Sequence, residues 1–190
     1  MKGKKTLIVI LVILVIVGFI IGFFAGGYNS LVKAQTAVET KQADIQTQLQ
    51  RRADLIPNFV ATVKGYTKYE QDTLTAVTEA RASVSKATNA ASLSEAGDQL
   101  DKAISVWVNA VTEAYPELKA NSNYIALQDE LSGTENRIAV ARRDYNEAVQ
   151  TYNTMIKTFP KNILAGMFNF EKADFFAAAE DSQTVPNVEF

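Results

Sequence analysis

Hydrophobic side chains follow two different patterns along this chain. Leu7 to Phe24 form an unbroken apolar run of 18 residues, of which 16 are Leu, Ile, Val or Phe. A helix of that length crosses the hydrocarbon core of a bilayer, and its side chains favour insertion by roughly 5–10 kcal/mol. From Tyr28 onward the apolar residues recur every three or four positions, which is typical of amphipathic helices. The chain therefore divides into a membrane-spanning helix and a helical body.

Proline is expected to divide the first part of the helical body. The pattern predicts a first amphipathic helix over residues 28–50. Pro57 cannot donate an intrahelical hydrogen bond and its ring clashes with the preceding turn, so we expect the chain to turn back there. Asp54 would then cap a second helix that ends near Thr88.

Two further helices follow. Ser92 with Glu95 three residues later predicts a capping box at the start of a third helix, which ends near Pro116. A fourth helix over residues 122–159 carries the most regular stripe, in alternating steps of three and four residues that resemble a coiled-coil seam. Its members are Tyr124, Leu127, Leu131, Thr134, Ile138, Ala141, Tyr145, Ala148, Tyr152, Met155 and Phe159.

These elements define the expected fold class. Short links make sequential helices antiparallel, so we expect an all-α protein with a single N-terminal transmembrane helix followed by an antiparallel up-down four-helix bundle with long helices. The expected domains are a basic segment (1–6), the anchor (7–27), the bundle (28–160) and an aromatic C-terminal segment packed on the bundle (161–190).

The ends of the apolar run predict its orientation. Lys2, Lys4 and Lys5 precede it, which favours a cytoplasmic N terminus and an extracytoplasmic bundle in a bacterial cell membrane. The run is longer than a typical signal-peptide core, so a retained anchor is favoured over cleavage after residues 25–27.

Three glycines in the anchor recur every four residues: Gly18, Gly22 and Gly26. They share one helix face and could let a second transmembrane helix approach closely, as in a homo-oligomer. The alternative is that glycine is simply frequent in membrane helices.

Composition excludes several kinds of chemistry. Cysteine and histidine are absent, so thiolate nucleophiles, disulfides, Cys/His zinc sites and His-based triads are excluded. The chain has 19 basic and 21 acidic residues, and three of the basic residues are lysines that precede the anchor. The helical body is therefore net acidic, which argues against nucleic-acid binding. We expect no catalytic residues, no metal site and no cofactor.

Two groups of residues are candidate interaction sites. The first lies at the expected turn and could bind an anion or a partner carboxylate through its arginines, although pairing within the bundle is the alternative: Arg51, Arg52, Asp54, Pro57 and Asn58. The second is the aromatic C-terminal segment, which could dock on the bilayer interface or a partner, although packing back on the bundle is the alternative: Phe168, Phe170, Phe175, Phe176 and Phe190.

Several stretches, in order and spacing, resemble the LemA family of bacterial membrane proteins. They include Arg51–Asn58, Val63–Tyr66, Tyr115–Ala120, Glu135–Arg142 and Pro186–Phe190. The resemblance implies an N-terminally anchored helical bundle in a bacterial membrane, without an agreed activity. Tyr69 stands where many members have a histidine, so no histidine role carries over.

The function predicted from these observations is that of a non-enzymatic, single-pass membrane-anchored scaffold or adaptor in the bacterial envelope, with a protein partner. The alternative is a helical bundle at the membrane that binds a small ligand or has weak enzymatic activity.

Overall fold

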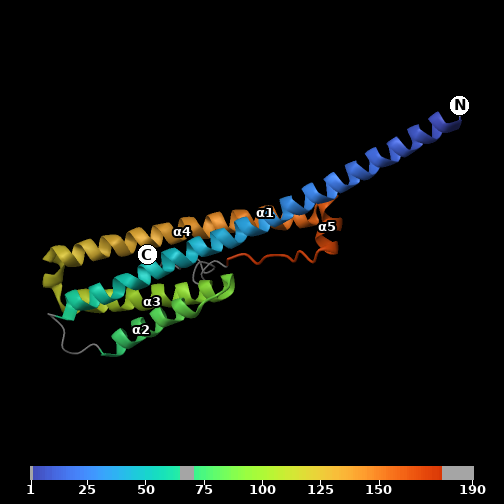
Figure 1. The fold of residues 1–190 in the computed structure, drawn as a ribbon. Coiled ribbons are helices and arrows are strands. Elements are labelled where there is room, and N and C mark those ends of the chain that lie inside the picture. Colours follow the sequence, from blue (N-terminus) through green and yellow to red (C-terminus); the bar gives the residue numbers. More distant parts are fainter. Residues whose placement is uncertain (1, 65–70, 177–190) are drawn as a thin grey trace, which may run out of the picture. The chain divides into compact units, whose positions relative to one another are not determined.

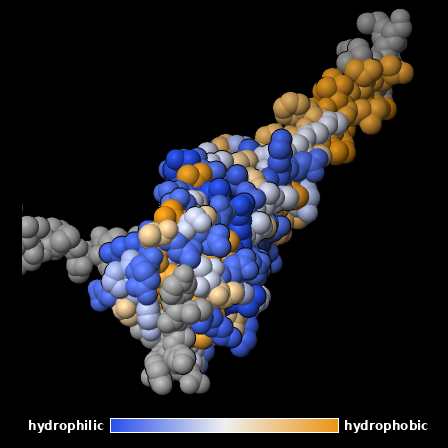
Figure 2. Space-filling model, turned by 90° about the vertical axis from the view of Figure 1, so that its left-hand side faces the viewer, coloured by the Kyte–Doolittle hydropathy of each residue, from blue (hydrophilic) through white to orange (hydrophobic). Residues whose placement is uncertain are grey.

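A computed structural model of the chain describes residues 2–64 and 71–176, and its regular elements are all helical (Figure 1). They are α1 (Lys2–Lys64), α2 (Gln71–Lys86), α3 (Ala90–Ala114), the short 3₁₀ helix η1 (Pro116–Ala120), α4 (Ser122–Lys157) and α5 (Lys161–Met167). The all-α fold class and the long apolar N-terminal helix are confirmed. Among the described residues, α1 is the one helix long and apolar enough to cross a membrane. Figure 2 shows its apolar side chains as a continuous hydrophobic surface.

The chain forms two compact units. The first comprises the described residues of 1–39 and 148–173, and the second those of 40–147 and 174–190. Helices α1 and α4 contribute to both units. The domain boundaries expected after residues 27 and 160 stay predictions.

The turn predicted at Pro57 is wrong. Helix α1 continues through Pro57 to Lys64, and Asp54 lies inside the helix rather than at its cap. A proline in a helix interior removes a backbone hydrogen bond and costs about 3 kcal/mol. Ile56 and Phe59, on either side of the proline, are both buried. Tertiary packing of this kind outweighs the local preference for a break.

The starts and ends of the other helices follow their caps. Asn89, not Ser92, is the N-cap of α3: its side chain accepts from Ser92 N at 2.9 Å, while the Ser92 hydroxyl accepts from Asn89 N at 3.1 Å. The capping box is therefore shifted by three residues from the prediction. Asn121 Oδ1 accepts from the backbone of Tyr124 and so caps the start of α4.

The core of the second unit is built on an aromatic cluster. The Phe59 ring lies 5.0 Å from Trp107 and 5.0 Å from Tyr124, so it joins α1 to α3 and α4. Most of the predicted stripe on α4 is buried, but Leu127, Ala148 and Met155 are half-buried and Phe159 is exposed.

Contacts give the direction of neighbouring helices in this unit. Lys41 pairs with Asp144 at 3.7 Å and Arg51 with Glu130 at 2.6 Å, so α1 and α4 run in opposite directions. The contact of Arg52 with Asp101 and that of Phe59 with Trp107 show that α1 and α3 run in the same direction.

The core of the first unit joins α1 to α5. Leu31, Leu164 and Ala165 are buried together, and Met155, Ile156 and Phe170 pack against them. A side chain at Gly27 would overlap Leu164, so a glycine at this position lets α5 approach α1 closely. By contrast, among the described residues no atom beyond the helix's own neighbouring backbone lies within 4 Å of a Cβ built at Gly18, Gly22 or Gly26, and the helix-packing role of these glycines stays a prediction.

Replacing Pro57 with alanine should stabilise the protein. Pro57→Ala restores the missing backbone hydrogen bond, and we expect the free energy of unfolding to rise by about 1–3 kcal/mol. Denaturant unfolding of the full chain in detergent, followed by circular dichroism, measures the change. Asn58→Ala, at the exposed neighbouring position, is the matched control. A loss of stability would contradict this account of α1.

Candidate functional site

The predicted group of arginines is paired within the bundle. Arg51 Nη2 donates to Glu130 Oε1 at 2.6 Å, and Arg137 Nη1 donates to the same oxygen at 3.2 Å. The hydrogen bond from Arg137, followed by that from Arg51, lowers the pKa of Glu130. Asp54 accepts from Gln50 at 2.9 Å. These pairs lie on the surface, where each contributes little to stability.

Arg52 differs from its neighbour because it is buried, with 3% of its surface exposed. Its Nε lies 3.2 Å from Asp101 Oδ1, and its Nη2 lies 3.7 Å from Glu135 Oε2. Neither Nε nor Nη1 of Arg52 makes a hydrogen bond. Burial raises the pKa of Asp101, against the opposing effects of Arg52 and Arg142. The arginine pairs with acids of α3 and α4, as the alternative interpretation expected.

The remaining residues of that group are surface positions of α1. Pro57 and Asn58 are both exposed, and Asn58 O accepts from the Thr62 hydroxyl at 3.0 Å. No turn is present at Pro57 to present the group, and its role in binding a partner stays a prediction.

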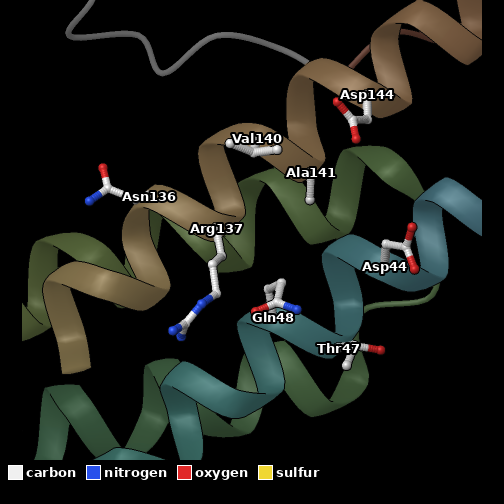
Figure 3. Close-up of a pocket in the computed structure, with 8 residues that line it drawn as sticks. All are labelled: Asp44, Thr47, Gln48, Asn136, Arg137, Val140, Ala141 and Asp144. Atoms are coloured by element: carbon white, nitrogen blue, oxygen red, sulfur yellow. The ribbon is translucent and has the colours of Figure 1, made fainter.

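A groove of about 380 Å³ lies between α1 and α4 in the second unit (Figure 3). Figure 3 shows Arg137 and Gln48 extending into the space between the two helices. The Gln48 Oε1 atom is buried without a hydrogen-bond partner. The lining residues are Asp44, Thr47, Gln48, Asn136, Arg137, Val140, Ala141 and Asp144.

The groove has an apolar middle and charged ends. Val140 is 47% exposed although it is a large hydrophobic residue. At one end Lys41 pairs with Asp44 at 3.4 Å and with Asp144 at 3.7 Å. At the other end lies Arg137, which is bonded to Glu130. This groove was not predicted from the sequence, because Val140 falls outside the regular stripe of α4; an apolar residue in that position was the available signal.

A second hollow, of about 400 Å³, lies between α3 and α4 and is bordered by Arg52. Its lining is mainly polar and includes Ser105, Asn109, Gln128 and Glu135. Donors and acceptors of this kind could orient a small polar molecule.

The segment that follows α5, residues 168–176, is held by hydrogen bonds between α4 side chains and its own main chain; we call it the C-terminal strap. In the first unit Asn153 Nδ2 donates to Ala173 O at 2.8 Å, and Asn153 Oδ1 accepts from Ala173 N at 2.9 Å. Tyr152 Oη donates to Glu171 O at 2.8 Å. Both α4 side chains are buried. An extended segment has polar backbone groups that need such partners when they are buried.

The same arrangement recurs in the second unit. Asn146 Nδ2 donates to Phe176 O at 3.2 Å and Asn146 Oδ1 accepts from Phe176 N at 2.8 Å. Tyr145 Oη donates to Asp174 O at 2.9 Å. The Phe176 side chain is buried, with the Arg142 guanidinium 4.9 Å from its ring centre.

The two tyrosine–asparagine pairs are seven residues apart on α4, and their strap partners are three residues apart. The repeat Tyr145-Asn146 and Tyr152-Asn153 is visible in the sequence. The two tyrosines were predicted as members of the apolar stripe of α4, whereas no role was predicted for the two asparagines.

The aromatic C-terminal group is thus divided between burial and exposure. Phe176 is buried and Phe170 is half-buried, as expected for packing on the rest of the chain, while Phe168 and Phe175 are exposed. Phe190 lies outside the described residues.

These features define a membrane-associated helical protein with one apolar N-terminal helix. The chain matches the LemA family over residues 41–190 and belongs to that family. LemA is not known as an enzyme family.

Several relatives share most of this chain. Protein LemA of Metamycoplasma hominis is 29% identical over 156 residues, which cover 82% of this chain and 71% of that protein. Magnetosome protein MamQ 2 of Paramagnetospirillum magneticum is 25% identical over 174 residues, covering 78% of this chain and 64% of that protein. Magnetosome protein MamQ of Magnetospirillum gryphiswaldense is 22% identical with the same coverage. This chain therefore matches less than two thirds of each of these magnetosome proteins.

Removing one asparagine should release part of the strap. Asn153→Ala leaves the Ala173 amide and carbonyl without their partners, at a cost of about 2–3 kcal/mol. We expect faster hydrogen exchange in peptides covering residues 168–176, measured by mass spectrometry on the full chain in detergent. Gln150→Ala, at an exposed position of the same helix, should leave exchange unchanged. Equal exchange in both variants would contradict the role of Asn153.

High pH should loosen the strap. Burial, with smaller contributions from Glu171 and Glu39, raises the pKa of Tyr152, so its stabilising effect is present below the ordinary tyrosine pKa of about 10 and is lost as the pH rises through the higher folded value. We expect the melting temperature to fall as the pH rises above the ordinary tyrosine pKa of about 10. Tyr152→Phe should lower stability by about 1 kcal/mol at pH 8 and weaken this dependence. An unchanged pH dependence would refute the assignment.

Proposed function

We propose that this protein is a non-enzymatic scaffold or adaptor, anchored in a bacterial membrane by α1, that binds another protein through the groove between α1 and α4. The exposed Val140 in the middle of this groove carries the proposal. Burying an exposed aliphatic side chain against a partner is favourable by about 1 kcal/mol or more, and a central apolar contact with a polar rim is typical of protein interfaces.

The ends of the groove define the kind of partner. Asp44 and Asp144 lie at one end and Arg137 at the other. An amphipathic helix with an apolar centre and polar residues at its two ends would complement this arrangement, since such helices commonly bind in grooves between helices. Relatives named as magnetosome proteins support a role in a cell structure.

The orientation is part of the proposal. Lys2, Lys4 and Lys5 precede the apolar run and favour a cytoplasmic N terminus, which would place the bundle outside.

Binding of a small ligand is a second candidate. The buried Arg52, with two nitrogens that make no hydrogen bond, borders the polar hollow between α3 and α4. A metabolite that stabilises the protein saturably in a thermal-shift screen, and loses this effect in Ser105→Ala, would favour this function.

One pair of variants tests the scaffold function and the orientation, because the chain has no cysteine. Val140→Cys places a thiol in the groove, and Glu113→Cys places one at an exposed position of α3. With a photoactivated maleimide crosslinker in native membranes, we expect a discrete crosslinked product from position 140 and none from position 113. A product of twice the chain's mass would instead indicate self-association, and no product from either position would contradict the proposal.

The control variant also reports the side of the membrane. Glu113→Cys should react with a membrane-impermeant maleimide in intact cells. Reaction only after lysis would place the bundle in the cytoplasm and reverse the proposed orientation.

A further inference from the structure

The first unit exposes a group of apolar side chains on and beside α5. Met167 is 61% exposed and Phe168 is 51% exposed, and Phe159 and Ile163 are also exposed. The opposite side of the same helix is buried through Leu164 and Ala165. Helix α5 is therefore apolar on both sides. The side with Leu164 and Ala165 is covered by the interior of the unit, and the other side is exposed.

The exposed group lies where the apolar run of α1 ends. Leu164 packs against Leu31 and Gly27, and the Phe168 ring lies 4.8 Å from Tyr28. Tyr28 follows Phe24, the last residue of the run, by one helical turn. Aromatic rings at this position are typical of the membrane–water interface.

The backbone after α5 fixes which rings point outward. Asn169 adopts a left-handed conformation with φ of 54°, which asparagine tolerates better than most residues. The following amide, Phe170 N, donates to Ala165 O at 2.9 Å, in the manner of a Schellman cap. Phe170 thereby packs on Leu164 and Ala165, while Phe168 stays exposed.

Charge near this surface matches a phospholipid headgroup layer. Lys33, Lys157, Lys161 and Lys172 belong to this unit, against two described acidic residues, Glu39 and Glu171. Such lysines can extend toward phosphate groups while their stems lie along apolar surface.

We propose that α5 is a second membrane contact, which lies in the bilayer interface beside the protein's own transmembrane helix. The side chains of Ile163, Met167 and Phe168 enter the boundary between headgroups and acyl chains, as in interfacial amphipathic segments. The occupant of this surface is lipid, because the surface is continuous with the part of α1 that could span the membrane. This contact is independent of the groove in the second unit.

The test uses the full chain in vesicles of phosphatidylcholine and phosphatidylglycerol. Ile163→Cys, which keeps both neighbouring aromatic rings, and Phe168→Cys are each labelled with the environment-sensitive dye NBD. We expect blue-shifted emission at both positions, loss of emission when lipids carrying a shallow nitroxide are included, and protection from aqueous iodide. Gln150→Cys, exposed on α4 of the same unit, should show iodide quenching and no nitroxide quenching.

Two results would overturn the proposal. Iodide quenching at positions 163 and 168 as strong as at position 150 would place α5 in water. Protection from both quenchers, together with formation of a 163–163 disulfide dimer, would show that a second copy of the chain covers the surface instead of lipid.

Discussion

The contact of Phe59 with Trp107 and Tyr124 holds α1 to α3 and α4 directly after Pro57. Without this packing, a proline in a helix interior would favour a break. Because α1 stays continuous, one helix carries both the apolar run that could span a membrane and the buried stripe of the bundle. Both units depend on it: Leu31 belongs to the core of the first, and Phe59 to the core of the second.

Sequence patterns predicted the elements whose stability is local and periodic, and they failed where a distant contact decides the outcome. The stripe of α4 follows from residues within a few positions of one another. The path through Pro57 depends on Trp107 and Tyr124, which no pattern around residue 57 reveals. The groove was not predicted for a similar reason: Val140 lines a groove only because α1 lies beside α4.

The two arginines show how identical side chains acquire different roles from burial. Arg51 is solvated and pairs with Glu130 on the surface, where water screens the interaction. Arg52 is buried, so losing its acidic partners would leave an uncompensated charge at a cost of several kcal/mol. Such a pair adds little to the net free energy of folding, but it disfavours other arrangements of the helices, in which the charge would be unpaired. The Arg52 contacts thus specify how α1 aligns with α3 and α4.

The C-terminal strap is attached to α4 mainly through its backbone, so its outward side chains are left to determine the chemistry of its surface. Asn146 and Asn153 bind backbone amides and carbonyls, which every residue other than proline carries. Attachment of the strap therefore depends little on the side chains it presents, apart from the buried Phe176 and the half-buried Phe170. The identity of the outward side chains of the strap and of α5, such as Phe168, is consequently not restricted by this attachment and can suit contacts outside the protein. The fold therefore tolerates an exposed aromatic ring beside the end of the apolar run, and such a ring would contribute to membrane binding.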